Sequence, residues 1–314
     1  MVKKMEIITE LVRSELLTST ALGYFDGVHR GHRAVIEEAV CYAREHGVLP
    51  AVFTLQQSPR LVLFGEAPKN IMPLEDKLRA FEQLGVERVY LIDFRTIRHI
   101  GAEGFVRDIL KGCFNAVHAG CGFNYHFGSG AEGNGEILHT LCRGLGISET
   151  TQPRLSYDGL PISSTRIRRC IAEGDLASAG RMLGRDYGFC LPVIHGRRLG
   201  HKLGYPTLNQ QFPQELVLPP FGAYTSQVVV DGRAYPGISN IGVKPTVGSS
   251  EVLIETWMPD YTGRELYGEK LKISFGRFIR PEKRFADLDE LRAAIENDRK
   301  ALQYDDAAHG RQGV

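Results

Sequence analysis

Strand-like apolar runs alternate with helical patterns through the first half of the chain, and this alternation restricts the fold more than any other feature. The apolar runs lie near residues 20–24, 48–55, 88–94, 116–121 and 149–155. Between them, apolar residues recur at helical spacing over residues 31–46, 75–84, 103–111 and 134–144. Strands joined by helices in this way form a parallel sheet with helices on both faces. We therefore predict an α/β fold with a doubly wound parallel sheet in the N-terminal half.

One loop, between the first strand and the first helix, carries the clearest chemical signal. Segment 21–33 reads ALGYFDGVHRGHR and places His29 and His32 at the start of the helix. A helix N-terminus offers unpaired N–H groups and a positive dipole end, so anions bind there. Imidazoles add hydrogen bonds to a phosphate and stabilise the charge that develops during its transfer. The pattern predicts a nucleotide-phosphate site that includes the histidines with Gly23, Phe25, Asp26 and Gly31.

The place of this loop in the predicted sheet supports the same hypothesis. Ligands of doubly wound sheets bind beyond the carboxyl ends of the strands. The histidine loop follows the first strand and Asn124 follows the fourth. Taken alone, the two histidines fit a pair of metal ligands or surface polar residues as well, but no third ligand stands nearby at a usable spacing.

A second cluster, GLPISSTRIRR at 159–169, follows the fifth strand. Ser163 or Ser164 is suited to cap the next helix. A cap does not explain three arginines in the first turns, where the helix dipole disfavours cations. Guanidinium groups bind phosphate oxygens in a fork, so we favour a polyphosphate-binding role over a solvated basic helix. The candidate residues are Ser164, Thr165, Arg166 and Arg168.

From Tyr187 onwards the pattern changes to short strands separated by turn residues. Asp231 and Gly232 join two of these strands and form the strongest hairpin signal in the chain. A last helix is expected over 287–303. Many short antiparallel strands with one closing helix suggest a small β-barrel. We predict an α/β domain over 1–185, a barrel domain over 186–305 and a disordered tail over 306–314.

Glycines and a PTLN segment suggest a phosphate site in the barrel. Gly196, Gly200 and Gly204 recur every four residues, which lets the backbone approach phosphates closely, although β-turns explain the spacing equally well. Thr207 and Asn209 place a hydroxyl and an amide oxygen on one face of a strand. These oxygens suit a Mg²⁺ ion shared with phosphates.

Glu255 is the third feature of the barrel. Strand alternation puts it on one face with Leu253 and Trp257. A carboxylate between large apolar neighbours is partly desolvated, which suits a general base; an ion-paired rim residue is the alternative.

The composition argues against several classes of function. Lys and Arg number 38 against 37 Asp and Glu, and a net charge of +1 gives no reason to expect nucleic acid or an anionic membrane as a partner. No apolar run is long enough to span a bilayer and no secretory core opens the chain, so we predict a cytoplasmic protein. Six scattered cysteines indicate reduced thiols rather than disulfides or zinc. Self-association is left open.

Several of these motifs together resemble a known family. GYFDGVHRGH resembles the HxGH signature of the nucleotidyltransferase superfamily, in the form found in bacterial bifunctional riboflavin kinase/FMN adenylyltransferases (FAD synthetases). ISSTRIR resembles the second ATP-binding motif of that superfamily, and GCGFNYHFGSGAEGN resembles the flavin-side loop of the family. GHKLGYPTLN, YPGISNIGVKPTVG and IETWMPDYTGRELYG resemble the riboflavin kinase module. The resemblance extends from about residue 20 to residue 302.

This resemblance implies two activities, riboflavin to FMN and FMN to FAD, with ATP as co-substrate. In the nucleotidyltransferase domain it implies that His29 and His32 stabilise the α-phosphate of ATP and that Asn124 lies on the flavin side. Ser164, Thr165, Arg166 and Arg168 would bind the triphosphate. In the kinase domain it implies that Thr207 and Asn209 bind Mg²⁺ and ATP phosphates, while Glu255 deprotonates the terminal ribityl hydroxyl.

The sequence departs from the family pattern at Tyr24, His126, His201 and Trp257. The alternatives are therefore an enzyme that kept one activity, a flavin- or nucleotide-responsive regulatory binder, and a nucleotidyltransferase for another phosphorylated acceptor. The histidine pair together with Glu255 favours an enzyme, because binding alone needs no base.

Overall fold

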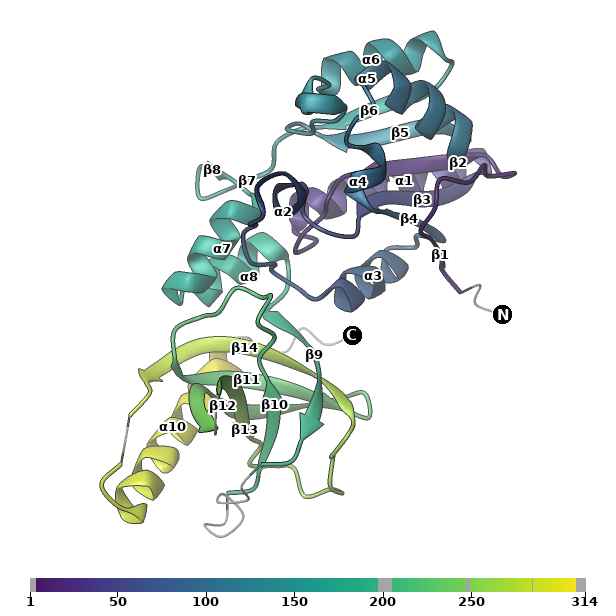
Figure 1. Ribbon diagram of the computed structural model, residues 1–314. Coiled ribbons are helices and arrows are strands. Elements are labelled where there is room, and N and C mark those ends of the chain that lie inside the picture. Colours follow the sequence, from purple (N-terminus) through teal and green to yellow (C-terminus); the bar gives the residue numbers. More distant parts are fainter. Residues whose placement is uncertain (1–3, 197–204, 247–248, 284, 309–314) are drawn as a thin grey trace. The chain divides into compact units, whose positions relative to one another are not determined.

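The computed structural model describes residues 4–196, 205–246, 249–283 and 285–308 of the 314-residue chain (Figure 1). The chain divides into two compact units. The first unit comprises Met1–Lys69 and Leu74–Ser164, and the second comprises Asn70–Pro73 and Thr165–Val314. The sequence predicted a domain boundary between residues 185 and 186. This boundary separates the parts of the chain to which the two activities were assigned, and it stays a prediction.

The first unit contains the predicted parallel sheet, with one strand more than expected. Its strands are β1 Glu6–Ile8, β2 Thr18–Leu22, β3 Leu49–Leu55, β4 Arg88–Ile92, β5 Ala116–Gly122 and β6 Ser148–Gln152. They lie in the order β1-β4-β3-β2-β5-β6, and every neighbouring pair is parallel. A small hairpin of β7 Ser156–Tyr157 and β8 Leu160–Pro161 follows β6.

The strand order reverses at β2. From β2 the chain proceeds to β3 and β4 on one side, and then crosses to β5 and β6 on the other. Leu22 at the end of β2 stands in register with Cys121 of β5, so the loops after these strands leave the same edge of the sheet. Such a reversal opens a crevice at the carboxyl ends of the strands, where doubly wound proteins bind their ligands.

Helices cover both faces of this sheet. They are α1 Arg30–His46, α2 Pro59–Phe64, α3 Leu74–Gln83, α4 Phe94–Ile97, α5 Ala102–Gly104, the π-helical η1 Phe105–Cys113, the short 3₁₀ turn η2 Ser129–Ala131 and α6 Gly135–Gly144. On one face, Ser19 Oγ donates a hydrogen bond to the Ala39 carbonyl of α1 at 2.7 Å. On the opposite face, Leu22 packs into the hydrophobic cluster formed with η1.

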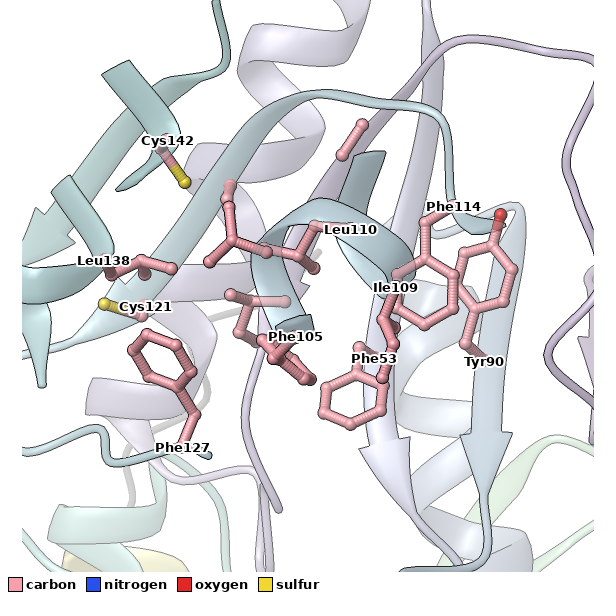
Figure 2. Close-up of a cluster of buried hydrophobic side chains, with 14 of the residues drawn as sticks. Phe53, Tyr90, Phe105, Ile109, Leu110, Phe114, Cys121, Phe127, Leu138 and Cys142 are labelled. Atoms are coloured by element: carbon pink, nitrogen blue, oxygen red, sulfur yellow. The ribbon is translucent and has the colours of Figure 1, made fainter. Parts of the chain in front are cut away.

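That cluster is built from large side chains that contact one another across the sheet and η1. Figure 2 shows Phe105, Ile109 and Leu110 of η1 beside Phe53 and Phe114, all of them buried. The rings of Phe53 and Phe105 lie 5.5 Å apart, edge to face. Burial of this much apolar surface stabilises the sheet whose edge carries the site.

The second unit is the predicted antiparallel barrel with a closing helix. Six strands close in the order β10-β13-β12-β11-β14-β9. They are β9 Tyr187–Ile194, β10 Thr207–Gln211, β11 Gly222–Val230, β12 Arg233–Thr246, β13 Ser249–Trp257 and β14 Lys270–Pro281. The helices described in this part of the chain are α7 Ser164–Glu173, α8 Leu176–Leu183 and α10 Leu288–Ala308. Asp231 and Gly232, at φ 50° and 78°, form the predicted hairpin turn between β11 and β12.

Two details of the second unit were not foreseen. Asn70–Pro73 belongs to it although it precedes the barrel by more than a hundred residues: Asn70 N–H donates to the Glu215 carbonyl at 2.8 Å, and Val217 N–H donates to the Asn70 carbonyl at 2.9 Å. In addition, α10 continues to Ala308, so residues 306–308 are helical rather than part of a disordered tail. Residues 309–314 lie outside the described residues.

Candidate active sites

The loop after β2 follows an unusual backbone path. Phe25, Gly27 and Val28 all have positive φ angles, at 55°, 79° and 38°. Glycine adopts such angles freely, but Phe and the β-branched Val do so only under strain. Strain of this kind persists where the surroundings over-determine the backbone, which is common at functional sites.

The two predicted histidines lie together at the start of α1. His29 is the N-cap residue of the helix, and its Nδ1 accepts a hydrogen bond from the backbone N–H of His32 at 3.2 Å. The two rings stack with centroids 3.5 Å apart. Because Nδ1 of His29 accepts, the neutral ring carries its proton on Nε2, and this N–H is a hydrogen-bond donor. The first turn of α1 contains no acidic residue, so the positive end of the helix dipole is not neutralised.

Gly23 and Gly31 are required by the rings that pack against them. A Cβ on Gly23 would lie 2.8 Å from the Phe25 ring, and a Cβ on Gly31 would lie 3.2 Å from the His29 ring. The Phe25 ring in turn meets the edge of His32 at 5.4 Å between centroids. The predicted residues of this loop therefore form one packed unit.

The serine of the second cluster reaches this loop. Ser164 Oγ donates to the carbonyl of Asp26, which is itself buried, at 3.0 Å. Ser164 and Asp26 both belong to the first unit. Thr165, Arg166 and Arg168 lie on α7 and are grouped with the second unit, and their part in triphosphate binding stays a prediction.

Asn124 occupies the loop that leaves β5, next to the end of β2 in the sheet. Its side chain is exposed, and its Oδ1 lies 3.8 Å from the position of a Cβ on Gly122. The turn is closed by the Tyr125 N–H, which donates to the Gly122 carbonyl at 2.9 Å. Asn124 thus lies at the same edge of the sheet as the histidine loop.

In the barrel, strand register brings the predicted kinase residues into one row. Asn209 of β10 stands opposite Glu255 of β13, and Thr207 stands opposite Trp257. The alternate residues Gln210, Ile254 and Thr256 are fully buried and fill the barrel interior. The predicted row therefore occupies the other face of these strands. On the side of β13 away from Asn209, Asn240 of β12 stands opposite Glu255. Asn240 was not predicted as a site residue from the sequence.

Gly196 lies against Asn209. A Cβ on this glycine would come 2.4 Å from the Nδ2 of Asn209 and 2.8 Å from its Oδ1. The Oδ1 atom is buried and has no hydrogen-bond partner among the residues that the structure describes. A buried amide oxygen without a partner is costly unless a ligand occupies it. Gly200, Gly204 and His201 lie outside the described residues.

A cavity of about 270 Å³ adjoins Thr207. Its walls include the buried side chains of Val193, Leu208 and Met258 together with the segment 261–267. This segment belongs to the IETWMPDYTGRELYG motif, from which only Glu255 was predicted as a site residue. Among the described residues, no group of three or more His, Cys, Asp and Glu side chains is placed to hold a metal ion.

Comparisons with known proteins decide which family combines these two sites. A model of the FAD synthetase family matches residues 13–166, and a model of the riboflavin kinase family matches residues 183–304. A bifunctional riboflavin kinase/FMN adenylyltransferase from Listeria monocytogenes is 35% identical, over 88% of this chain and 89% of its own. The protein of that name from Bacillus subtilis is also 35% identical, over 94% and 95%. The chain belongs to the bifunctional riboflavin kinase/FMN adenylyltransferase family.

A solved structure shares the fold of this family member over nearly its whole length. It is described as a macrolide-efflux protein from Streptococcus pneumoniae, is 27% identical and has a TM-score of 0.84. The match covers 95% of this chain and 99% of that one. Among the helices that the structure describes here, none combines the length and apolar character needed to cross a bilayer.

One residue beside the histidine loop of this riboflavin kinase/FMN adenylyltransferase family member was not predicted from its sequence. Lys77 of α3 is 5% exposed, and its Nζ donates to the Tyr24 carbonyl at 3.1 Å. A signal was present: Leu74, Lys77, Phe81 and Leu84 share one helical stripe, and a lysine in an otherwise apolar stripe is unusual.

Proposed function

We propose that this protein makes FAD from riboflavin in two ATP-dependent steps, each with its own set of catalytic residues. The proposal rests on two separate sets of polar side chains, each of which the fold brings together. His29 and His32 are stacked at the start of α1, and Asn209 is paired with Glu255 across two barrel strands. The family membership agrees with both activities.

In the second step, a phosphate oxygen of FMN attacks the α-phosphorus of ATP, and pyrophosphate leaves. The developing negative charge would be stabilised by His29, by His32 and by the N-terminus of α1. Donation from Nε2 of His29 is supported by the hydrogen bond that its Nδ1 accepts. Asn124 would contact the flavin side, while Ser164, Thr165, Arg166 and Arg168 would bind the triphosphate. In-line transfer needs positioning and charge stabilisation and no covalent enzyme intermediate.

In the first step, the terminal ribityl hydroxyl of riboflavin attacks the γ-phosphorus of ATP, and ADP leaves. Glu255 would take the proton of that hydroxyl as a general base. The cavity that Thr207 lines has both apolar and polar walls, and we propose that it takes the nucleoside part of ATP. This would lead the phosphates toward Gly196, whose missing side chain makes room for the Asn209 amide.

The donor set of the barrel also fits Mg²⁺. Asn209 offers a buried Oδ1 that has no partner among the described residues, and Thr207 offers a hydroxyl two residues before it on the same strand face. Hard oxygen donors of this kind suit Mg²⁺ together with phosphates. The bound ion would neutralise charge on the transferring phosphoryl group. We also propose a cytoplasmic location, where flavin and ATP meet.

Incubating the purified chain with riboflavin, ATP and Mg²⁺ and separating the products tests the proposal. FMN should appear first and FAD should follow, with ADP and pyrophosphate released. FMN without FAD would leave a kinase alone, and flavin binding without turnover would point to a regulatory binder. Supplying FMN instead of riboflavin examines the second step by itself.

A further inference from the structure

Lys77 is a buried cation in the first unit. Neither the proposed phosphate chemistry nor the packing of the core explains why a charged residue stands at this position. Its side chain reaches from α3 to the ends of two strands. Nζ donates to the Tyr24 carbonyl at 3.1 Å and to Thr54 Oγ1 at 3.3 Å. The same ammonium group lies 4.8 Å from the centroid of the Tyr24 ring, within range of a cation–π interaction.

Keeping this charge inside the protein is unfavourable. Burial lowers the pKa of Lys77 to about 8, and the nearby carboxylate of Asp26 offsets part of that effect. The groups that contact Nζ from β3 and from the end of β2 are neutral, namely the Thr54 hydroxyl and the Tyr24 carbonyl and ring. An uncharged side chain of similar length would fill the same space at lower cost. A residue that lowers stability in this way is typical of a position that serves function.

The loop that Lys77 contacts is the strained one. Tyr24 immediately precedes Phe25, whose φ is 55°, and Val28 follows at φ 38°. Angles of this kind are maintained only when neighbouring groups hold the backbone in place. The carbonyl of Tyr24 is held from two directions, because Thr54 Oγ1 also donates to it at 3.0 Å.

A second side chain of α3 holds the same loop one helical turn further on. Phe81 is fully buried, and its ring meets the Phe25 ring edge to face at 5.9 Å. Phe25 contacts His32, which stacks on His29. A continuous set of contacts therefore runs from α3 through Tyr24 and Phe25 to the histidine pair.

We propose that Lys77 is a positioning residue for adenylyl transfer, whose ammonium group holds the Tyr24–Phe25 backbone and thereby the histidine pair in the geometry that receives the α-phosphate. This inference rests on the proposed function of the first unit. Lys77 acts through the loop and contacts no substrate. Loss of its charge should impair the transition state more than the binding of ATP, since the histidines would remain present but misplaced.

Lys77→Met is the variant of choice. The unbranched thioether fills the same space, and the Thr54 hydroxyl continues to satisfy the Tyr24 carbonyl, so this carbonyl keeps a hydrogen-bond partner. We expect kcat for FMN adenylylation to fall by about 10- to 100-fold, with KM for ATP changed by less than about threefold. Riboflavin phosphorylation by the same molecule should be unaffected. Lys111→Met, at an exposed lysine of the same unit, is the matched control and should behave as wild type.

The pH profile of the wild type provides an independent test. Its kcat for adenylylation should decline as the pH passes about 8, where Lys77 loses its proton, whereas the low kcat of Lys77→Met should stay level from pH 7 to 9.5. The proposal would be overturned if Lys77→Met had the same kcat as the wild type. It would also be overturned if the kcat of the wild type stayed level up to pH 9.5. Parallel loss of both activities with a lower melting temperature would also overturn it, because that indicates a general structural role. A wild type that forms no FAD contradicts the function proposed for the first unit instead.

Discussion

Asn209 and Glu255 stand directly opposite each other on β10 and β13, although 45 residues of chain separate them. Side chains opposite each other on neighbouring strands lie about 5 Å apart at their Cβ atoms. The amide and the carboxylate are therefore close enough to act together in the kinase step that we propose. Gly196 lies against the same amide from the end of β9.

Glu255→Gln should abolish most of the riboflavin kinase activity. The amide cannot accept the proton of the ribityl hydroxyl, so kcat for FMN formation should fall by about 10²- to 10⁴-fold. Conversion of supplied FMN to FAD should continue at the wild-type rate. Glu251→Gln, four residues earlier on β13, is the control. Product analysis by chromatography with each substrate distinguishes the outcomes, and normal FMN formation by Glu255→Gln would exclude the base role.

Gly196→Ala should impair the kinase through Asn209. The new methyl group would lie within 2.8 Å of three atoms of the Asn209 amide, so either the amide or the backbone must move. We expect a rise in KM for ATP of about tenfold or more, because the phosphates approach the backbone here. Gly144→Ala, where a Cβ meets nothing within 4 Å, should have no effect on either activity. Initial-rate measurements at varied ATP concentration would reveal the difference, and an unchanged KM would argue against phosphate binding at this glycine.

His29→Ala should stop the reaction sequence at FMN. Loss of an electrostatic donor at a developing charge lowers kcat by about 10²- to 10³-fold. The substitution also removes the N-cap contact to His32 N–H, so modest destabilisation of about 1 kcal/mol is expected. His46→Ala, at the exposed C-terminal end of the same helix, serves as the control. FAD formation at the wild-type rate by His29→Ala would contradict the assignment.

Asp298→Ala should destabilise the barrel. This carboxylate of α10 is 2% exposed in its side chain and pairs with Arg280 of β14 through contacts of 2.9 to 3.1 Å. Removing one partner of a buried pair costs about 3 kcal/mol. Asp289→Ala breaks an exposed pair with Arg292 and should cost less than about 1 kcal/mol. The single tryptophan, Trp257, lies on β13, so urea unfolding followed by its fluorescence reports on this unit.

Lys77 should make the stability of the first unit depend on alkaline pH. Its pKa is about 8 in the folded protein and 10.5 in the free side chain, so the unfolded chain binds more protons between these pH values. The free energy of unfolding should therefore rise with pH through this window, by roughly 3 kcal/mol in total. Lys77→Met should lack this rise. Protection of the buried Cys121 from a thiol reagent, measured across a urea series, monitors this unit, and identical pH slopes in the two proteins would contradict the lowered pKa.

Local patterns were sufficient for much of this protein. The alternation of apolar runs predicted the parallel sheet, and Asp231-Gly232 predicted the hairpin turn. His29 and His32 were predicted at the start of α1 because helix starts and phosphate loops have signatures within a few residues. Thr207 and Asn209 share a strand face for the same reason, since side chains alternate along any strand. These features depend only on residues that are close together in the chain, so they can be predicted from the sequence alone.

Other features depended on the tertiary structure. Only strand pairing decides that Glu255 faces Asn209 on one side and Asn240 on the other. Asn70–Pro73 joins the second unit through hydrogen bonds to residues near 216, and no local sequence pattern predicts these hydrogen bonds. The packing of α3 against the sheet brings Lys77 within hydrogen-bonding distance of the Tyr24 carbonyl. The sequence by itself thus determined the elements and the chemistry of each motif, whereas the tertiary structure decided which distant residues support them, because these contacts arise only when remote segments are packed together.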